Sequence, residues 1–279
     1  LMLPASPLHH LLAQGCARPL VCTSGNRAEE PLAVDVAEAH RRLGDIADAW
    51  LDHDRPIRRA LDDSVMRVVD GAPQCLRAGR GLAPVVLAAP NTAAVLACGG
   101  QLKNTVALAA QGRVIVGQHL GDLDDALTLD AMHAATRDLQ RFHAVTPKVA
   151  AVDLHPDYAG DADGPAGDLP RHRVPHHLAH ALAVMLEHGL EGPLLAVTWD
   201  GAGLGPDGRL WGGEFLEVCR APRPSWRRLA HLRDFALPGG DAAARDPRRA
   251  LAGVLWELPA LRASVPADLR LVLTHGINV

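Results

Sequence analysis

The chain has 279 residues, which is enough to bury a sizeable core and to divide into two domains. Its formal net charge of −4 gives no electrostatic reason to expect nucleic-acid binding, and its apolar runs are too short to predict a membrane-spanning helix. The N-terminal residues lack the basic segment of a signal peptide, and the five cysteines show neither CxxC pairs nor regular spacing. We therefore expect a protein of the reducing cytoplasm, in which Cys98 is a buried apolar residue rather than a nucleophile.

The first part of the chain, residues 1–84, has the pattern of α/β structure. The predicted elements are a strand at 19–23, a helix around 35–43 and a strand that ends the segment 52–69. Glycine, proline and alanine are frequent in the residues that follow. We interpret 85–91 as a linker between two domains.

The second part, residues 92–279, begins with three short apolar runs separated by turns, which predicts a β-meander. A helix over 129–143 is expected to place four apolar side chains on its buried face, namely Leu129, Met132, Leu139 and Phe142. The elements expected after it are a strand at 148–153, a helix at 175–189, a strand at 193–200 and a hairpin at Asp207-Gly208 that leads into 209–218. This order matches one half of an actin-like (ASKHA) ATPase fold and the start of the second half.

Two histidines, His176 and His180, stand one helical turn apart in the predicted helix 175–189. Residues at i and i+4 lie on one face of a helix, so both imidazoles can reach one metal ion. Asp200, at the end of the next predicted strand, can supply a third ligand. His177 occupies the position of the general base of a H-E-x-x-H zinc protease, so that hydrolytic site is not expected. Imidazole and carboxylate ligands suit Fe(II) or Zn(II), and the sequence does not separate the two.

A glycine-rich run follows the candidate ligand Asp200. Gly201 and Gly203 are expected to form a turn whose backbone N–H groups are open to phosphate. Metal and phosphate ligands so close in the sequence suggest a nucleotide-dependent enzyme.

Eight segments in a fixed order carry a family resemblance: PLVCTSGN, HDRPIRRALDDSV, ACGGQLKNTVALA, GQHLGDLDDALT, AVDLHPDY, VPHHLAHALAVMLEHG, WDGAGLGPDGRLWGGEF and LPGGDAAARDPRRA. In these segments the chain resembles the HypF carbamoyltransferases of [NiFe]-hydrogenase maturation. The resemblance implies the C-terminal part of a YrdC-like α/β domain over 1–84. It also implies the first portion of a TsaD-like, actin-fold carbamoyltransferase domain over 92–279. The acylphosphatase domain, the CxxC zinc fingers and the end of the TsaD-like domain have no counterpart in this sequence, so a fragment of a longer protein is implied.

The resemblance also implies roles for residues of the YrdC-like part. Ser24 and Asn26 resemble a nucleotide-contacting S-x-N element, although TSGN is a common turn sequence. Arg55, Arg58 and Asp63 resemble polar residues of the same pocket. A lysine-arginine element that lies upstream in the family is missing, which puts independent adenylation in doubt.

In the TsaD-like part, the resemblance implies a first phosphate turn that contains Lys103 and Asn104, with an ordinary hairpin as the alternative. Gly201 and Gly203 would form the corresponding turn of the second half, beside the metal ligands His176, His180 and Asp200. Catalytic roles are implied for Asp200 and for Glu214, which would orient the transferred group or simply close a hairpin. His155 and Asp157 would line the same cleft or form a turn at the end of a strand.

By resemblance, the full enzyme uses carbamoyl phosphate and ATP with Mg²⁺ to form carbamoyl-adenylate, and a bound Fe(II) or Zn(II) assists the transfer. The acceptor is a C-terminal cysteine of a HypE-type protein, and no nucleic acid or membrane is involved. Two alternatives stay open. One is a related TsaD-type or O-carbamoyltransferase, and the other is a non-catalytic fragment that only docks a partner.

Overall fold

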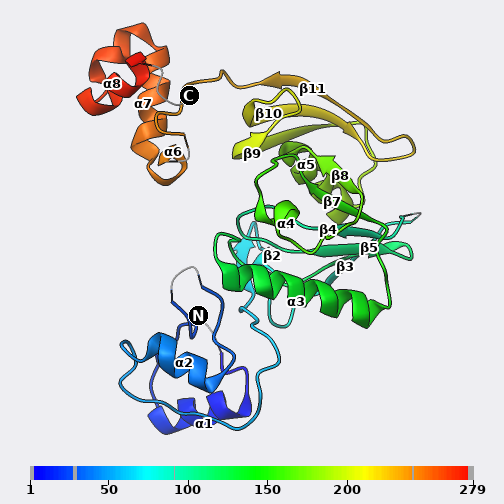
Figure 1. Cartoon of the computed structure of the whole chain (residues 1–279), viewed down its shortest axis with the longest axis vertical. Helices are drawn as coiled ribbons and strands as arrows, with labels where there is room; N and C mark the ends of the chain where they lie inside the picture. Colours follow the sequence, from blue (N-terminus) through cyan, green and yellow to red (C-terminus); the bar gives the residue numbers. More distant parts are fainter. Residues whose placement is uncertain (1–2, 28–29, 91, 241, 276–279) are drawn as a thin grey trace. The chain divides into compact units, whose positions relative to one another are not determined.

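The computed structural model describes residues 3–27, 30–90, 92–240 and 242–275. Three parts of the predicted domains and linker lie outside the described residues: the start of the first domain at 1–2, Asn91 of the linker, and the end of the second domain at 276–279. Figure 1 shows the course of the whole chain, which divides into two compact units. Unit 1 comprises 1–152 and 156–172, and unit 2 comprises 153–155 and 173–279. No described helix is both long and apolar enough to cross a lipid bilayer.

The N-terminal part of unit 1 contains α1 (Pro7–Cys16) and α2 (Val36–Leu43). The predicted helix around 35–43 is confirmed, with Asp35 as its N-cap: the Asp35 carboxylate accepts a hydrogen bond from the N–H of Glu38. The strand predicted at 19–23 is wrong, because these residues are exposed and form no strand. An apolar run becomes a strand only where another strand satisfies its backbone groups, and none does so here among the described residues.

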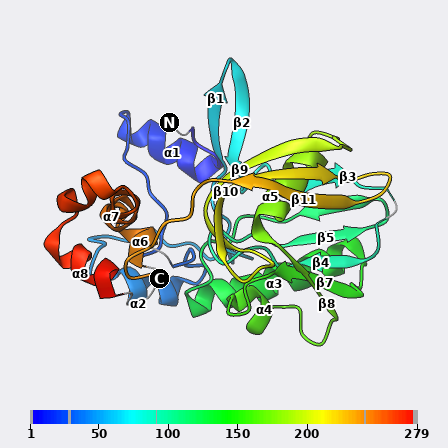
Figure 2. The same cartoon turned by 90° about the horizontal axis from the view of Figure 1, so that it is seen from above.

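A β-hairpin follows, made of β1 (Val65–Val69) and β2 (Ala72–Arg77) in antiparallel pairing (Figure 2). The predicted strand at the end of 52–69 is thereby confirmed. Asp70 and Gly71 form the tight turn, with φ values of 49° and 76°. Both central residues of such a two-residue turn need positive φ, which explains the Asp-Gly pair.

Unit 1 is built around a six-stranded sheet of order β3-β6-β5-β4-β7-β8. Its strands are β3 (Val85–Ala88), β4 (Val95–Ala97), β5 (Ala107–Ala110), β6 (Arg113–Val116), β7 (Val149–Asp153) and β8 (Arg171–Val174), of which β8 and the end of β7 lead into unit 2. The predicted meander β4-β5-β6 and the strand β7 are confirmed, and β7 runs parallel to β4. The predicted linker 85–91 is corrected, because β3 within it pairs with β6 as an edge strand of the sheet.

The core of unit 1 lies between this sheet and α3 (Ala126–His143). Met132 is fully buried, and Leu129 and Leu139 pack against the same cluster, as predicted. Phe142 is instead 84% exposed. Ten residues beyond Met132, it lies about 80° around the helix from that side chain, at the edge of the buried face. Cys98 is buried in this core, and burial raises the pKa of its thiol to about 11, which supports the structural interpretation.

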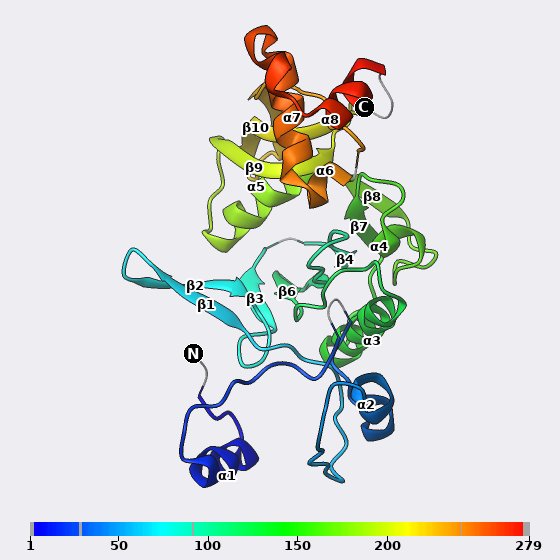
Figure 3. The ribbon, with the colours of Figure 1, turned by 90° about the vertical axis from the view of Figure 1, so that its left-hand side faces the viewer.

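Unit 2 contains a three-stranded antiparallel sheet of order β11-β10-β9. Its elements are α5 (His176–Glu187), β9 (Leu194–Leu204), β10 (Leu210–Cys219) and β11 (Ser225–His231), then α6 (Ala242–Arg245), α7 (Pro247–Glu257), the 3₁₀ helix η1 (Pro259–Ser264) and α8 (Ala267–His275) (Figure 3). Leu178, Ala181 and Met185 of α5 pack against Leu216 and Val218 of β10. The predicted hairpin at Asp207-Gly208 is confirmed between β9 and β10.

Candidate metal centre

The three predicted metal ligands meet in unit 2. His176 Nε2 lies 2.8 Å from Asp200 Oδ2, and His180 Nε2 lies 3.4 Å from the same oxygen. The two Nε2 atoms are 3.2 Å apart. One ligand atom from each residue falls within 4.8 Å of the others, as the i, i+4 spacing on α5 and the neighbouring strand β9 require.

Asp200 lies within β9 rather than at its end. The strand continues to Leu204, so the turn predicted at Gly201 and Gly203 is corrected: both glycines are strand residues, and Gly203 pairs with Trp211 of β10. The N–H of Gly201 donates to Asp200 Oδ1 at 2.8 Å. This hydrogen bond leaves Oδ2 to face the two histidines.

Gly203 has a packing role that the sequence did not reveal. A Cβ atom at this position would lie 2.6 Å from His176 Cβ and 2.9 Å from its Cγ. Only a glycine therefore allows β9 to approach the first turn of α5 this closely. The close approach helps to bring the strand that carries Asp200 against the helix that carries both histidines.

Replacing Gly203 by alanine is expected to separate β9 from α5, at a cost of about 1–3 kcal/mol in the free energy of unfolding. Binding of Zn(II) should weaken with it, because the three ligands no longer meet. Urea unfolding and zinc titration of G203A would measure both effects. The matched control is G201A, where a Cβ meets nothing within 4 Å. Equal behaviour of the two variants would contradict this account.

Asp153, which the sequence analysis missed, lies beside the ligand set. Its Oδ2 is 2.7 Å from His176 Nδ1. Hydrogen bonds to Asp153 and Asp200 raise the pKa of His176 to about 9, and the two histidines hold the pKa of Asp200 far below its usual range. Asp153 ends the predicted strand 148–153, and this is the same sequence feature that identified Asp200 as a candidate ligand.

These residues fit a divalent metal ion. Two imidazoles and a carboxylate are a donor set for Zn(II) or Fe(II), and three protein ligands leave a coordination position for a substrate oxygen. The raised pKa of His176, about 9, favours its protonated form at neutral pH. A metal bound at Nε2 would displace that proton.

His177 is fully buried. Its ring lies 6.1 Å from the Trp211 ring, and burial lowers its pKa. The residue thus contributes to the packing of α5 on the sheet.

Glu214 is 1% exposed and forms a two-point ion pair with Arg228, at 2.6 Å and 2.7 Å. The Arg228 guanidinium lies 4.2 Å from the centre of the Trp211 ring, and Glu214 Oε1 accepts a hydrogen bond from the N–H of Gly212 at 3.3 Å. These contacts describe a residue that holds β10 and β11 together. The orienting role predicted for Glu214 stays a prediction.

In the first predicted phosphate turn, Lys103 and Asn104 differ in burial. Lys103 is exposed with φ 50°, and its N–H donates to the Asp122 carboxylate at 2.6 Å. Asn104 is buried, and its amide donates to the carbonyls of Cys98 and Gly100. Asn104 therefore shapes the turn, and phosphate contact by the exposed Lys103 stays a prediction.

The predicted nucleotide residues of the first part are not gathered at one cavity. Among the described residues, Arg58 lines a cavity of about 300 Å³ between α2 and α3, whereas Ser24, Asn26, Arg55 and Asp63 do not line it. Ser24 and Arg55 are exposed, and Asp63 pairs with Arg80 at the surface.

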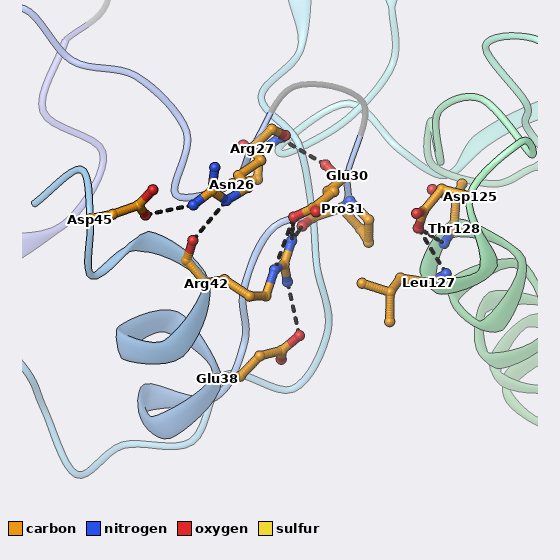
Figure 4. Close-up of polar contacts among 10 residues, drawn as sticks. All are labelled: Asn26, Arg27, Glu30, Pro31, Glu38, Arg42, Asp45, Asp125, Leu127 and Thr128. Carbon is orange, nitrogen blue, oxygen red and sulfur yellow. Dashed lines mark hydrogen bonds and ion pairs between the residues drawn. The ribbon is translucent and has the colours of Figure 1, made fainter.

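Asn26 holds its own loop together. Its amide donates to the carbonyls of Arg27 and Glu30, and the carboxylate of Glu30 pairs with Arg42 (Figure 4). Arg42 also donates to Glu38 and to the carbonyl of Pro31. Nucleotide contact by Ser24, Asn26, Arg55 and Arg58 stays a prediction.

Comparison with family models gives three matches along the chain. A model described as the HypF Kae1-like domain matches residues 90–187, and one described as the second subdomain of the carbamoyltransferase Kae1-like domain matches 196–271. Residues 1–79 match the Sua5/YciO/YrdC family, described as telomere recombination. These matches do not test the domain boundary predicted near residue 84, which stays a prediction.

Several relatives are named Carbamoyltransferase HypF. The protein of Synechocystis sp. is 45% identical over 91% of this chain and 33% of its own length. That of Rhizobium leguminosarum is 41% identical over 89% of this chain and 34% of its own length. A crystal structure of full-length HypF in its phosphate- and nucleotide-bound form superposes with a TM-score of 0.90 at 34% identity, over 99% of this chain and 45% of that one.

The similarity thus extends over almost all of this chain and over about a third of each relative named above. It joins an N-terminal YrdC-like part to a Kae1-like part in one order. The structural match to full-length HypF has the same mixed α/β architecture. The chain belongs to the family of the HypF carbamoyltransferases.

Proposed function

We propose that this chain forms part of an ATP-dependent carbamoyltransferase of [NiFe]-hydrogenase maturation. Carbamoyl phosphate, water and ATP with Mg²⁺ give carbamoyl-adenylate, phosphate and pyrophosphate. The carbamoyl carbon then passes to the C-terminal cysteine of a HypE-type protein in the cytoplasm. The observation that carries the proposal is the meeting of His176, His180 and Asp200 within a chain of this family.

The chemistry exchanges one carbon–oxygen bond for one carbon–sulfur bond. The acceptor thiolate attacks the carbamoyl carbon, the bond to the phosphate oxygen breaks, and AMP leaves with its electron pair. Adenylation makes this possible because AMP is a good leaving group. A bound Fe(II) or Zn(II) would supply Lewis acidity toward phosphate or carbonyl oxygens.

The residues of this chain would hold the metal, bind phosphate and keep the ligand-bearing strand in place. His176, His180 and Asp200 would hold the metal, and Asp153 accepts the hydrogen bond of His176 Nδ1. Lys103 would provide an exposed cation for phosphate at the first turn. Gly203 keeps the ligand-bearing strand against the helix.

The test is titration calorimetry of ATP with Mg²⁺ against the purified chain. We expect binding that weakens about tenfold or more in K103Q, because a hydrogen bond to a charged group contributes about 1.5–3 kcal/mol. The matched control is K148Q, which removes the other exposed lysine of the chain. Absence of ATP binding would instead favour a fragment that only docks a partner.

A further inference from the structure

Asp153 lies outside the predicted ligand set, yet its carboxylate contacts one of the ligands. It is the last residue of β7, and its Oδ2 lies 2.7 Å from His176 Nδ1. The Asp153 side chain is 8% exposed, so water screens this contact little. Both residues belong to unit 2.

The backbone around Asp153 fixes the direction of its carboxylate. Oδ1 accepts a hydrogen bond from the N–H of His155 at 2.9 Å. The N–H of Leu154 donates to the carbonyl of Val174 at 3.1 Å. This hydrogen bond ties the turn to Val174, which only Pro175 separates from α5. One oxygen of the carboxylate is thus used by its own turn, and the other is directed at His176.

The contact decides which nitrogen of His176 faces the ligand cluster. A carboxylate accepts hydrogen bonds, so Nδ1 carries a proton that Asp153 accepts. Nε2 lies 2.8 Å from Asp200 Oδ2, and it would supply the lone pair when a metal displaces its own proton. A carboxylate acceptor also makes the imidazole a better electron donor toward a metal.

We propose that Asp153 is a positioning residue that holds the metal ligand His176 in the Nδ1–H form with Nε2 directed at the metal. The proposal rests on the proposed metal-dependent function. Its effect is specific to one ligand. Among the described contacts, Nδ1 of His176 has a carboxylate partner, whereas His180, whose side chain is 56% exposed, meets Asp200 and His176 through Nε2.

The alternative is that Asp153 only joins the end of β7 to α5 as a structural ion pair. The two accounts differ in metal binding. A structural pair affects the free energy of unfolding and leaves the affinity of the folded protein for metal unchanged. A positioning residue changes that affinity, by about 10- to 100-fold for groups that orient a ligating histidine.

The test is a Co(II) titration of the whole chain followed by its visible absorption, which reports ligand geometry, with Zn(II) competition for affinity. We expect D153N to bind Co(II) about 10- to 100-fold more weakly than the unmodified chain and with an altered spectrum. The matched control is D234N. It removes an exposed aspartate that also pairs with a histidine, His231, at 3.3 Å, and it should leave affinity and spectrum unchanged.

The outcomes separate this inference from the function on which it rests. Tight Co(II) binding by both the unmodified chain and D153N, with one spectrum, would overturn the positioning role and leave the metal site standing. No binding of Co(II) or Zn(II) by the unmodified chain would overturn both. If D153N fails to fold, ¹⁵N NMR of the zinc-loaded unmodified chain decides: a proton on Nδ1 and zinc on Nε2 of His176 are expected, and zinc on Nδ1 contradicts the proposal.

Discussion

The double variant H176A/H180A is expected to lose its bound metal. It removes two of the three ligand atoms that lie within 4.8 Å of one another and leaves Asp200 alone. Loss of a group that merely orients a ligand already costs about 10- to 100-fold in affinity, so removal of two ligands should lower zinc affinity by more than about 100-fold. Elemental analysis for Fe and Zn after purification, and zinc titration of the chelator-treated protein, would measure this loss.

The control for this variant is H188A. His188 caps the other end of α5 and is exposed, so its replacement removes an imidazole from the same helix without touching the cluster. We expect H188A to retain its metal. Unchanged metal content in H176A/H180A would rule out this site, whereas equal loss in H188A would mean that the helix rather than the ligand set was damaged.

How far the sequence predicted this site depends on how local each feature is. The i, i+4 spacing of His176 and His180 is a property of one helix, and it placed both imidazoles correctly. The contact between Asp153 and His176 joins residues 23 positions apart, and only the folded chain brings this last residue of β7 to α5. The sequence shows Asp153 at the end of an apolar run, but it does not show the contact with His176.

The two wrong predictions about strands have a related physical cause. Residues 19–23 have a strand composition but no partner, whereas residues 85–88 have the composition of a linker and pair with β6, about 28 residues later. Strand formation is decided by distant backbone partners, which composition does not report. The glycines after Asp200 pose the same problem. They suggested a turn, but Gly203 is needed because α5 packs directly on β9.

Replacing Arg228 by methionine is expected to destabilise unit 2 by about 3–5 kcal/mol. The change leaves the Glu214 carboxylate, 1% exposed, without the guanidinium that contacts both of its oxygens. It also removes the cation that lies over the Trp211 ring at 4.2 Å. Urea unfolding followed by tryptophan fluorescence would measure the loss, because four of the five tryptophans belong to unit 2: Trp199, Trp211, Trp226 and Trp256.

Two further variants separate the buried ion pair from a general effect on the strand. R227M removes the neighbouring arginine of β11, which is 68% exposed and pairs with the 42% exposed side chain of Glu217, and little change in stability is expected. In E214L/R228M both charges are gone, and stability should return most of the way, because an apolar pair avoids the cost of burying an unpaired charge. If E214L/R228M remains as unstable as R228M, the cost arises from lost packing rather than from an unpaired carboxylate.

The same series bears on the two roles predicted for Glu214. A carboxylate that serves to hold β10 against β11 can be replaced together with Arg228 while the metal ligands stay in place. A carboxylate that also orients the transferred group cannot be replaced without loss of carbamoyl transfer, even in a stable protein. E214L/R228M should therefore retain zinc affinity in either case. Transfer activity in the corresponding full-length protein then decides between the two roles, because stability and metal binding have already been restored.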